Sequence, residues 1–387
     1  MATPRADTYS AASGQAVRGG RNAIPSWISA QPVGQWFNAP NSTVAGLATD
    51  AGTVQPYIMN SYSGTVMAGN RLFAFGGGHG DGTDNTVAVY DLDAGAGWSV
   101  FCQPTPVAQR NSAVNGDTDL SKFWWGDPGN LKPNPCHTYS YGQYVPEQNR
   151  LIWLCHRGVY SFSGYIGAND RMLQLKLDTA SWVQPGSAED ILVAGDAFAS
   201  VRLPSGIILH SSSGSYIKAF DPSQPIGSQI TNWVYDGSLN WNGYGQYLLD
   251  SAHNRIVRVG NAYGTALYKL IDLTTKAVTD LGALLNGDAG VLSGLNSLCI
   301  VDTMGACIDP INNRVVIPLQ AAGGQFYAID LDTYTVTLQS PSLVAGATVA
   351  KQPGSGGSFG RVHYHDTYKC IVYSPDASAP MALMRLA

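Results

Sequence analysis

A unit of about 50 residues recurs along most of the sequence, and this repeat restricts the fold more than any other feature. Each copy has a polar turn that leads into an apolar segment, and an aspartate-containing turn ends the next segment. The polar turns begin at Asn70, Asn149, Ser205, Asn254 and Asn313, with a weaker one at Tyr368. The aspartates of the second turn are Asp91, Asp178, Asp221, Asp272 and Asp330. Short apolar segments repeated at this period indicate the four-stranded blades of a kelch-like β-propeller.

The first complete copy, residues 71–93, shows the pattern most clearly: RLFAFGGGHGDGTDNTVAVYDLD. An apolar strand runs into a glycine-rich turn that holds His79 and Asp81, and an alternating strand then ends in Asp-Leu-Asp. A phosphate-binding loop needs a Lys-Ser or Lys-Thr pair and a following helix, whereas here an alternating strand follows. We therefore interpret the glycines as a tight turn between the second and third strands of a blade.

The number of copies predicts an all-β, six-bladed propeller. Five copies are complete, whereas the sixth, from residue 359, reaches Ala387 with only three strands. We expect residues 33–40 to supply its fourth strand and to close the ring, because closure removes open sheet edges. Residues 33–387 then form a single domain, and residues 1–32 form an extended N-terminal arm. Seven blades are the alternative if residues 105–133, which we expect to be a loop insertion, hide a degenerate blade.

The composition excludes some partners. Charged residues make up 13% of the chain and its net charge is −5, so we expect no nucleic-acid partner. No segment approaches the ~18 apolar residues of a membrane span, and the N-terminus lacks the apolar core of a secretory signal. We therefore expect no membrane insertion, and we expect a virion or extracellular location for a protein released by lysis. A mature domain without its signal and a cytosolic protein are the alternatives.

The six cysteines are too few for a disulfide scaffold, and they form no CxxC pair or zinc-ribbon spacing. We therefore predict no metal site and no cofactor. Ca²⁺ at Asp81, or Zn²⁺ at the Cys-His pairs described below, is compatible with the sequence but not implied by it. The sequence leaves the redox state of the cysteines open.

The propeller predicts where polar side chains gather. The loops between second and third strands lie on the same face of the ring as the connections between blades. We call this face the loop face and the opposite one the turn face. His253 falls on the turn face, whereas most histidines fall on the loop face, where imidazole can donate, accept or carry charge near neutral pH. The ligand-binding candidates on the loop face are His79, Asp81, His210, Tyr263, Arg361 and His363.

A Cys-His dipeptide occurs twice, on strands that we expect to be antiparallel neighbours. Strand alternation places both histidines on one side and both cysteines on the other, which argues against a shared zinc site. His137 and His156 beside Arg157 could neutralise the carboxylate of a uronic acid, while a tyrosine removes the C5 proton in a β-elimination. The alternative is a structural role, with buried thiols and with histidines held by loop carbonyls.

Three segments resemble kelch-like propeller proteins encoded in bacterial and tailed-phage genomes. They are SWISAQPVGQWFNAPNS from residue 26, GGGHGDGTDNTVAVYDLD from residue 76 and CHTYSYGQYVPEQNRLIWL from residue 136. The resemblance covers mainly residues 26–160 and implies the propeller. We expect a non-enzymatic virion protein of a tailed phage, in a tail fibre, baseplate or decoration position. It would contact other virion proteins through its N-terminal arm, or bind host surface glycans.

A more distant similarity points to the alternative function. Propeller polysaccharide lyases of the ulvan-lyase kind use two histidines with a tyrosine and an arginine, and His137, His156, Tyr244 and Arg157 are the matching residues here. In that case the protein is a glycan-active enzyme that acts by β-elimination. The sequence leaves open the choice between binder and enzyme, the identity of any glycan and the oligomeric state.

Overall fold

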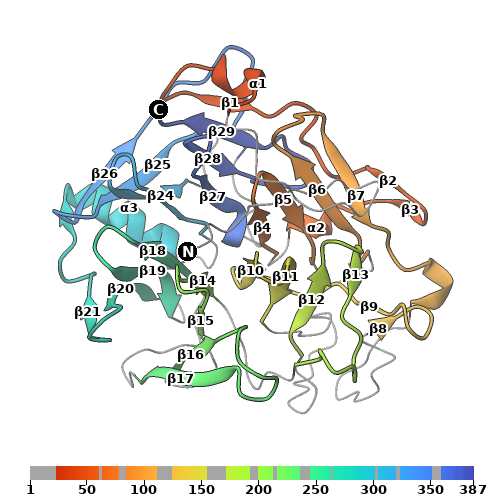
Figure 1. Cartoon of the computed structure of the whole chain (residues 1–387). Coiled ribbons are helices and arrows are strands. Elements are labelled where there is room, and N and C mark those ends of the chain that lie inside the picture. The colour runs from red at the N-terminus through yellow and green to blue at the C-terminus, as the bar shows by residue number, and fades with distance from the viewer. Residues whose placement is uncertain are drawn as a thin grey trace.

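The computed structural model describes residues 23–387 except 61–62, 78–83, 111–123, 155–170, 192–198, 212–215, 236–244, 263–264, 301–303, 320–322 and 351–358. In this part of the chain, six sheets of mainly antiparallel strands stand in a ring, with the first strand of each at the centre (Figure 1). The predicted all-β, six-bladed propeller is therefore confirmed. Among the described residues, no helix has the length and apolar character that crossing a membrane requires.

Blades 1 to 3 each contain four consecutive antiparallel strands, ordered from the centre of the ring outward. Blade 1 consists of β4 (Thr65–Ala68), β5 (Arg71–Ala74), β6 (Val87–Asp91) and β7 (Trp98–Cys102). Blade 2 consists of β10 (Gly142–Val145), β11 (Arg150–Trp153), β12 (Leu173–Lys176) and β13 (Ser181–Trp182). Blade 3 consists of β14 (Ser200–Arg202), β15 (Ile208–Ser211), β16 (Tyr216–Phe220) and β17 (Ile230–Tyr235).

Blade 4 follows the same scheme, whereas blades 5 and 6 add strands from elsewhere in the chain. Blade 4 consists of β18 (Gly245–Asp250), β19 (Arg255–Ala262), β20 (Thr265–Asp272) and β21 (Val278–Asp280). Blade 5 consists of β23 (Cys307–Asp309), β24 (Arg314–Pro318), β25 (Phe326–Asp330) and β26 (Thr335–Gln339), with β22 (Asn286–Gly287) parallel to β26. Blade 6 consists of β27 (Val362–His365), β28 (Cys370–Tyr373), β29 (Ala382–Arg385) and β1 (Trp36–Asn38).

The N-terminal strand β1 closes the ring. It pairs antiparallel with β29, so that Trp36 lies opposite Met384 and Asn38 lies opposite Ala382. The buried indole of Trp36 also donates a hydrogen bond from Nε1 to the carbonyl oxygen of Gly324 in blade 5, at 2.8 Å. The sixth blade thus combines both ends of the domain, as the count of strands predicts.

The sheets of the described residues form six blades and no seventh, so the seven-bladed alternative is wrong. The described part of residues 105–133 contains the short helix η1 (Val107–Gln109) and one pair of short strands, β8 (Trp124–Trp125) and β9 (Lys132–Pro133). Both tryptophans of β8 are buried. Two hydrogen bonds between Leu131 and the side chain of Gln184 fasten this segment to blade 2.

Besides β1, four short elements precede blade 1 in the described part of the chain, and residues 1–22 of the predicted N-terminal arm lie outside the described residues. The elements are α1 (Ser26–Ser29), β2 (Ala48–Thr49), β3 (Gly52–Thr53) and α2 (Tyr57–Asn60). Ile28 of α1 is buried against the apolar cluster between blades 6 and 1. The described end of the arm is therefore packed onto the propeller.

The two turns that mark each repeat have a physical reason. Asn149, Asn254 and Asn313 end the first turn of their blades with positive φ angles of 51°, 49° and 48°, which asparagine tolerates better than most residues. Four aspartates of the second turn accept a hydrogen bond from the backbone N–H group two residues further on, as Asp272 does from Thr274 at 2.9 Å; the other three are Asp91, Asp221 and Asp330. The repeat in the sequence is therefore a repeat of turn chemistry.

The helix α3 (Ala289–Ile300), between blades 4 and 5, was not predicted. It packs against β19 and β20 of blade 4 and β26 of blade 5, and Leu295, Leu298 and Cys299 bury their side chains in the apolar cluster there. Tyr268 Oη donates a hydrogen bond to Cys299 Sγ at 2.8 Å. The helix thus packs between the sheets of blades 4 and 5.

Candidate functional site

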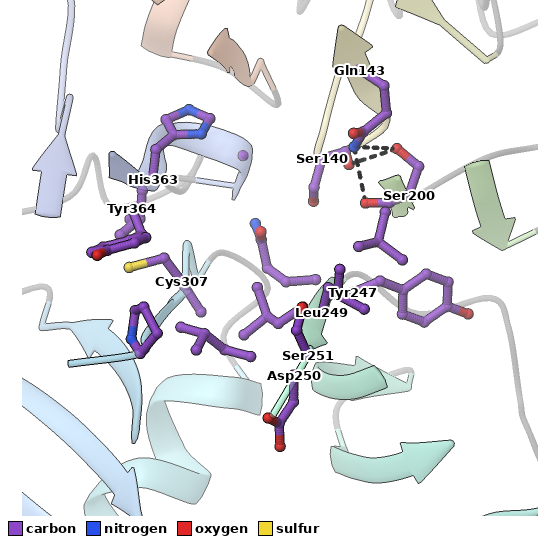
Figure 2. A pocket seen from close by; sticks show the side chains of 18 of the residues that line it. Ser140, Gln143, Ser200, Tyr247, Leu249, Asp250, Ser251, Cys307, His363 and Tyr364 are labelled. Atoms are coloured by element: carbon purple, nitrogen blue, oxygen red, sulfur yellow. Dashed lines mark hydrogen bonds between the residues drawn. The ribbon is translucent and has the colours of Figure 1, made fainter. Parts of the chain in front are cut away.

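The described part of the chain contains a pocket of about 520 Å³ at the centre of the ring. Its wall consists of the first strands of the six blades, β4, β10, β14, β18, β23 and β27 (Figure 2). Its lining also includes residues of the first turns of blades 4 to 6, namely Ser251, Ala252, Pro310, Asn313 and Asp366. These turns lie on the turn face, so the pocket extends to that face.

At the other end of the pocket, Tyr139 and Ser140 occupy the centre of the ring. Gly360 N donates a hydrogen bond to Tyr139 O at 3.4 Å, and Ser200 N donates to Ser140 O at 3.1 Å. Ser140 Oγ donates to Gly245 O at 2.8 Å. The segment that precedes β10 thus contacts blades 3, 4 and 6, and its backbone closes the pocket toward the loop face.

Tyr139 holds an uncommon backbone conformation at this closed end. Its φ angle is 36°, in the left-handed region that bulky side chains seldom adopt. The ring packs edge-on against Phe359 at 5.2 Å between centroids, and its hydroxyl lies 2.9 Å from Nδ1 of His137. Gly64 of blade 1 approaches Tyr139 O so closely that a Cβ atom there would collide with it. Packing from several blades therefore fixes the strained residue.

Two glutamines present hydrogen-bond acceptors to the pocket. Gln143 Nε2 donates to the backbone oxygen of Ser200 at 3.2 Å and to its Oγ at 3.0 Å, and Gln246 Nε2 donates to Met304 O at 3.5 Å. Because a backbone oxygen only accepts, these bonds fix the orientation of both carboxamides. Neither Oε1 accepts a hydrogen bond from any described residue, and both side chains line the pocket. Both oxygens are therefore available to a ligand.

Ser140 and Ser200 lie next to Gln143 on one side of the pocket, and Cys307 and Tyr364 lie on the opposite side (Figure 2). Ser200 Oγ donates to Ser140 O at 3.3 Å. This bond and those from Gln143 join β10 to β14 beside the closed end. This side of the pocket is thus a fixed array of uncharged polar groups.

Of the loop-face candidates among the described residues, His363 lines the pocket. Its Nε2 lies 2.8 Å from Thr65 Oγ1, which donates its own proton to Gly360 O at 3.1 Å. The Thr65 hydroxyl therefore accepts from His363 Nε2. Burial, with a smaller contribution from the nearby His365, lowers the pKa of His363 to about 4. The imidazole is therefore neutral at pH 7.

Carboxylates lie at the turn-face end of the pocket. Asp250 is buried and pairs with Arg255 Nε at 2.8 Å and with His253 Nδ1 at 2.8 Å. Asp366 is exposed and pairs with Lys369 at 2.7 Å. The charge of each carboxylate is thus offset by a basic neighbour.

The remaining titratable side chains of the lining are uncharged at neutral pH. Burial raises the pKa of the Cys307 thiol, and it also raises the pKa of Tyr364 and of Tyr247. The thiol and both phenols therefore keep their protons. Figure 2 shows that the ring of Tyr247 points away from the pocket. Apart from the paired carboxylates of Asp250 and Asp366, the pocket thus offers uncharged hydrogen-bonding groups.

Six of the site residues predicted from the sequence lie outside the described residues. They are His79, Asp81, His156, Arg157, Tyr244 and Tyr263. His137 and His210 are buried and do not line the pocket. His137 forms its hydrogen bond with Tyr139, and His210 Nδ1 lies 3.2 Å from its acceptor, Ser211 O. Burial lowers the pKa of His210 to about 4, so its imidazole is neutral.

Arg361 directly precedes β27, and it is fully buried. Its guanidinium nitrogens have no hydrogen-bond partner among the described residues, and burial lowers its pKa to about 10. Tyr373 and Asp376 lie close enough to oppose this shift. Arg361 does not line the pocket.

Three polar residues of the pocket lining were not predicted from the sequence. Gln143, Ser200 and Gln246 lie on the first strands of blades 2, 3 and 4, among apolar residues that face the neighbouring blades. A polar residue on the first strand of several repeats is the signal that could have found them, since these strands surround the axis of the ring. Within the described residues, no group of three or more His, Cys, Asp or Glu side chains could hold a metal ion.

The sheet pairings and the central pocket define the protein as a six-bladed β-propeller with a polar pocket on its axis. No model of a protein family and no curated protein matches the chain. A chain in a solved structure described as "Crystal Structure of Mitotic Checkpoint Complex" has a TM-score of 0.43 and 10% sequence identity, over 92% of this chain and 96% of that chain.

Proposed function

We propose that the protein is a carbohydrate-binding propeller and that the pocket on its axis is the binding site. The observation that carries this proposal concerns Gln143 and Gln246. Their side-chain N–H groups donate to backbone carbonyl oxygens, and their Oε1 atoms are available to accept hydrogen bonds from a ligand in the pocket. Sugar hydroxyls are donors that fit such fixed acceptors. A pocket of about 520 Å³ is also within the size range of small-ligand sites.

The electrostatics of the pocket support an uncharged ligand. His363 is neutral, Cys307 and Tyr364 keep their protons, and Asp250 is paired with two basic side chains. A strongly anionic or cationic ligand would meet no unpaired opposite charge among the described lining residues. A neutral glycan gives up few charge interactions on entry, and its hydroxyls replace water at the acceptors.

The test is binding to a glycan array, followed by calorimetric titration of the strongest hit against variants. Replacing both Gln143 and Gln246 by methionine keeps the side-chain length and removes both acceptors. Two lost hydrogen bonds predict an affinity about 10- to 100-fold weaker. Gln148→Met is the matched control, because Gln148 also donates to a backbone carbonyl, at 2.9 Å from Pro222 O, but on the exposed surface. An array without hits, or an unchanged affinity of the double variant, would overturn the proposal.

The polysaccharide lyase stays a prediction from the sequence. His137, the one described residue of its predicted catalytic set, binds the hydroxyl of Tyr139. Incubation with uronate polysaccharides, with absorbance of the unsaturated product as readout, tests it against His137→Ala. The virion location also stays a prediction, and mass spectrometry of purified phage particles would test it.

A further inference from the structure

We infer that the pocket recognises the end of a glycan chain and not an interior segment. This inference rests on the proposed function, and it follows from the shape of the pocket. The pocket extends to the turn face, whereas the backbone of Tyr139 and Ser140 closes it toward the loop face. An interior segment of a polymer needs two ways out of a binding site. A pocket closed at one end offers only one.

The closed end is built from backbone and not from a side chain that could swing aside. Tyr139 O and Ser140 O accept hydrogen bonds from the N–H groups of Gly360 and Ser200, and Ser140 Oγ donates to Gly245 O. These contacts come from blades 6, 3 and 4. Opening this end for a threaded chain would break bonds in three blades together.

The φ angle of 36° at Tyr139 adds to this rigidity. Any movement of the segment would also have to shift the packed rings of Phe359 and Tyr141, which lie 5.2 Å and 5.9 Å from the ring of Tyr139. Positive-φ strain persists only where the surrounding structure over-determines it. The closed end is therefore a preformed stop for the ligand.

The available acceptors fit recognition of a chain end. Gln143 Oε1 belongs to the side chain that binds Ser200, and Ser200 in turn binds Ser140 at the closed end. The terminal sugar would place its hydroxyls on this group, while the next sugars would pass Ser251 and Asp366 at the turn face. Contacts should therefore be strongest for the terminal sugar and weaker for those that follow it.

The experiment uses a glycan array whose oligosaccharides share the same interior sugars but differ in their terminal sugar. Each oligosaccharide is attached to the surface in two ways, once through its reducing end and once through its non-reducing end. The full chain should bind in one of the two orientations only. Adding one further sugar to the free end of a bound glycan should weaken binding at least tenfold. Binding that persists in both orientations and after capping would overturn the inference but leave the glycan-binding function intact. An array without any signal would instead overturn the proposed function.

Two variants test the same point with free oligosaccharides of the hit. Gln143→Met, at the closed end, should weaken the binding of a disaccharide and of a hexasaccharide by the same factor, about 5- to 10-fold for one hydrogen bond. Ser251→Ala, at the turn face, should leave the disaccharide unaffected and weaken only the hexasaccharide. The reverse pattern would show that the ligand does not reach the closed end and would overturn the inference.

Discussion

His253 in the first turn of blade 4 binds Asp332 in the last turn of blade 5, with 2.8 Å between Nε2 and Oδ1. Its other ring nitrogen, Nδ1, lies 2.8 Å from Oδ2 of Asp250 in its own blade. The imidazole therefore bridges two blades on the turn face, next to the open end of the central pocket.

This bridge predicts a pH-dependent contribution to stability. The hydrogen bond to Asp250 is the main cause of a raised pKa for His253, to which Asp332 adds. Because the pKa of His253 is higher in the folded than in the unfolded chain, protonation stabilises the fold. This stabilisation is complete at pH values below the unfolded-state pKa near 6.5, and it is lost as the pH rises through the folded-state pKa. His253→Gln should therefore lower the free energy of unfolding more at pH 5.5 than at pH 8.5. The difference should be about 0.5–1 kcal/mol, because the pair is partly exposed.

Urea unfolding at the two pH values would measure the effect. Asp332→Asn is the companion variant, since it keeps the size of the side chain and removes the inter-blade charge. It should show the same pH dependence with a smaller amplitude, because Asp250 remains. Equal destabilisation by His253→Gln at both pH values would rule out the charged bridge.

Ring closure by β1 predicts a large effect at Trp36. The indole is fully buried, stacks edge-on with Tyr373 at 6.5 Å and donates to Gly324 O at 2.8 Å. Trp36→Ala should lower the free energy of unfolding by about 3–5 kcal/mol through the cavity it creates. Trp36→Phe keeps part of the volume and should cost about 1–3 kcal/mol, because Gly324 O loses its donor.

Trp27→Phe is the matched control for ring closure. Trp27 Nε1 also donates to a backbone oxygen, Leu92 O at 3.1 Å, but the side chain is only partly buried and lies outside the closing strand. The loss for this variant should be well below that for Trp36→Phe in chemical denaturation. If Trp36→Ala unfolded at nearly the wild-type denaturant concentration, β1 would not hold the ring together.

The fold was predictable because its determinants are local. The positive φ of Asn149, Asn254 and Asn313 and the bonds made by Asp272 depend on a few neighbouring residues, so they leave a repeat in the sequence. The closing strand followed from the missing fourth strand of the last repeat. The helix α3 left a weaker signal, because Leu295 and Leu298 gain most of their stabilisation from strands distant in sequence.

The pocket was not predictable in the same way. Gln143 and Gln246 belong to blades 2 and 4, and only the geometry of the ring brings them to the same pocket. The histidines of the sequence predicted a site on the loop face, but His210 is buried and outside the pocket lining. His363 lines the pocket and is neutral. A single sequence shows which residues are polar, whereas the free acceptor atoms follow from the bonds that each carboxamide makes.

His210 predicts that the protein is sensitive to acid. Burial lowers its folded-state pKa to about 4, below the unfolded value near 6.5. Between these values the unfolded chain binds a proton that the folded chain excludes, so stability falls as the pH drops from 6.5 to 4. His210→Leu should remove the uptake of up to one proton on unfolding. The slope of the unfolding free energy against pH should then fall by up to about 1.4 kcal/mol per pH unit.

His253 supplies the contrasting variant for this measurement, because its pKa is shifted in the opposite direction. His253→Gln should not reduce the loss of unfolding free energy at acidic pH, whereas His210→Leu should reduce this loss. The measurement is a series of urea titrations from pH 4.5 to pH 7. An unchanged slope for His210→Leu would show that His210 does not titrate as its burial requires.

Gly64 predicts how tightly the closed end of the pocket is packed. A Cβ atom at this position would overlap the backbone oxygen of Tyr139, and a backbone atom cannot rotate away as a side chain can. Gly64→Ala should therefore shift the Tyr139 segment and lower the free energy of unfolding by about 1–3 kcal/mol.

Gly290→Ala is the control. Gly290 lies in the first turn of α3, where a Cβ would meet only the flexible carboxylate of Asp288 at 3.1 Å. There alanine should be neutral or should stabilise the fold by up to ~1 kcal/mol, since it favours the helix. Thermal unfolding compares the stability of the two variants. If Gly64→Ala were as stable as Gly290→Ala, the closed end could adjust to the added Cβ atom without loss of stability, and the prediction would be wrong.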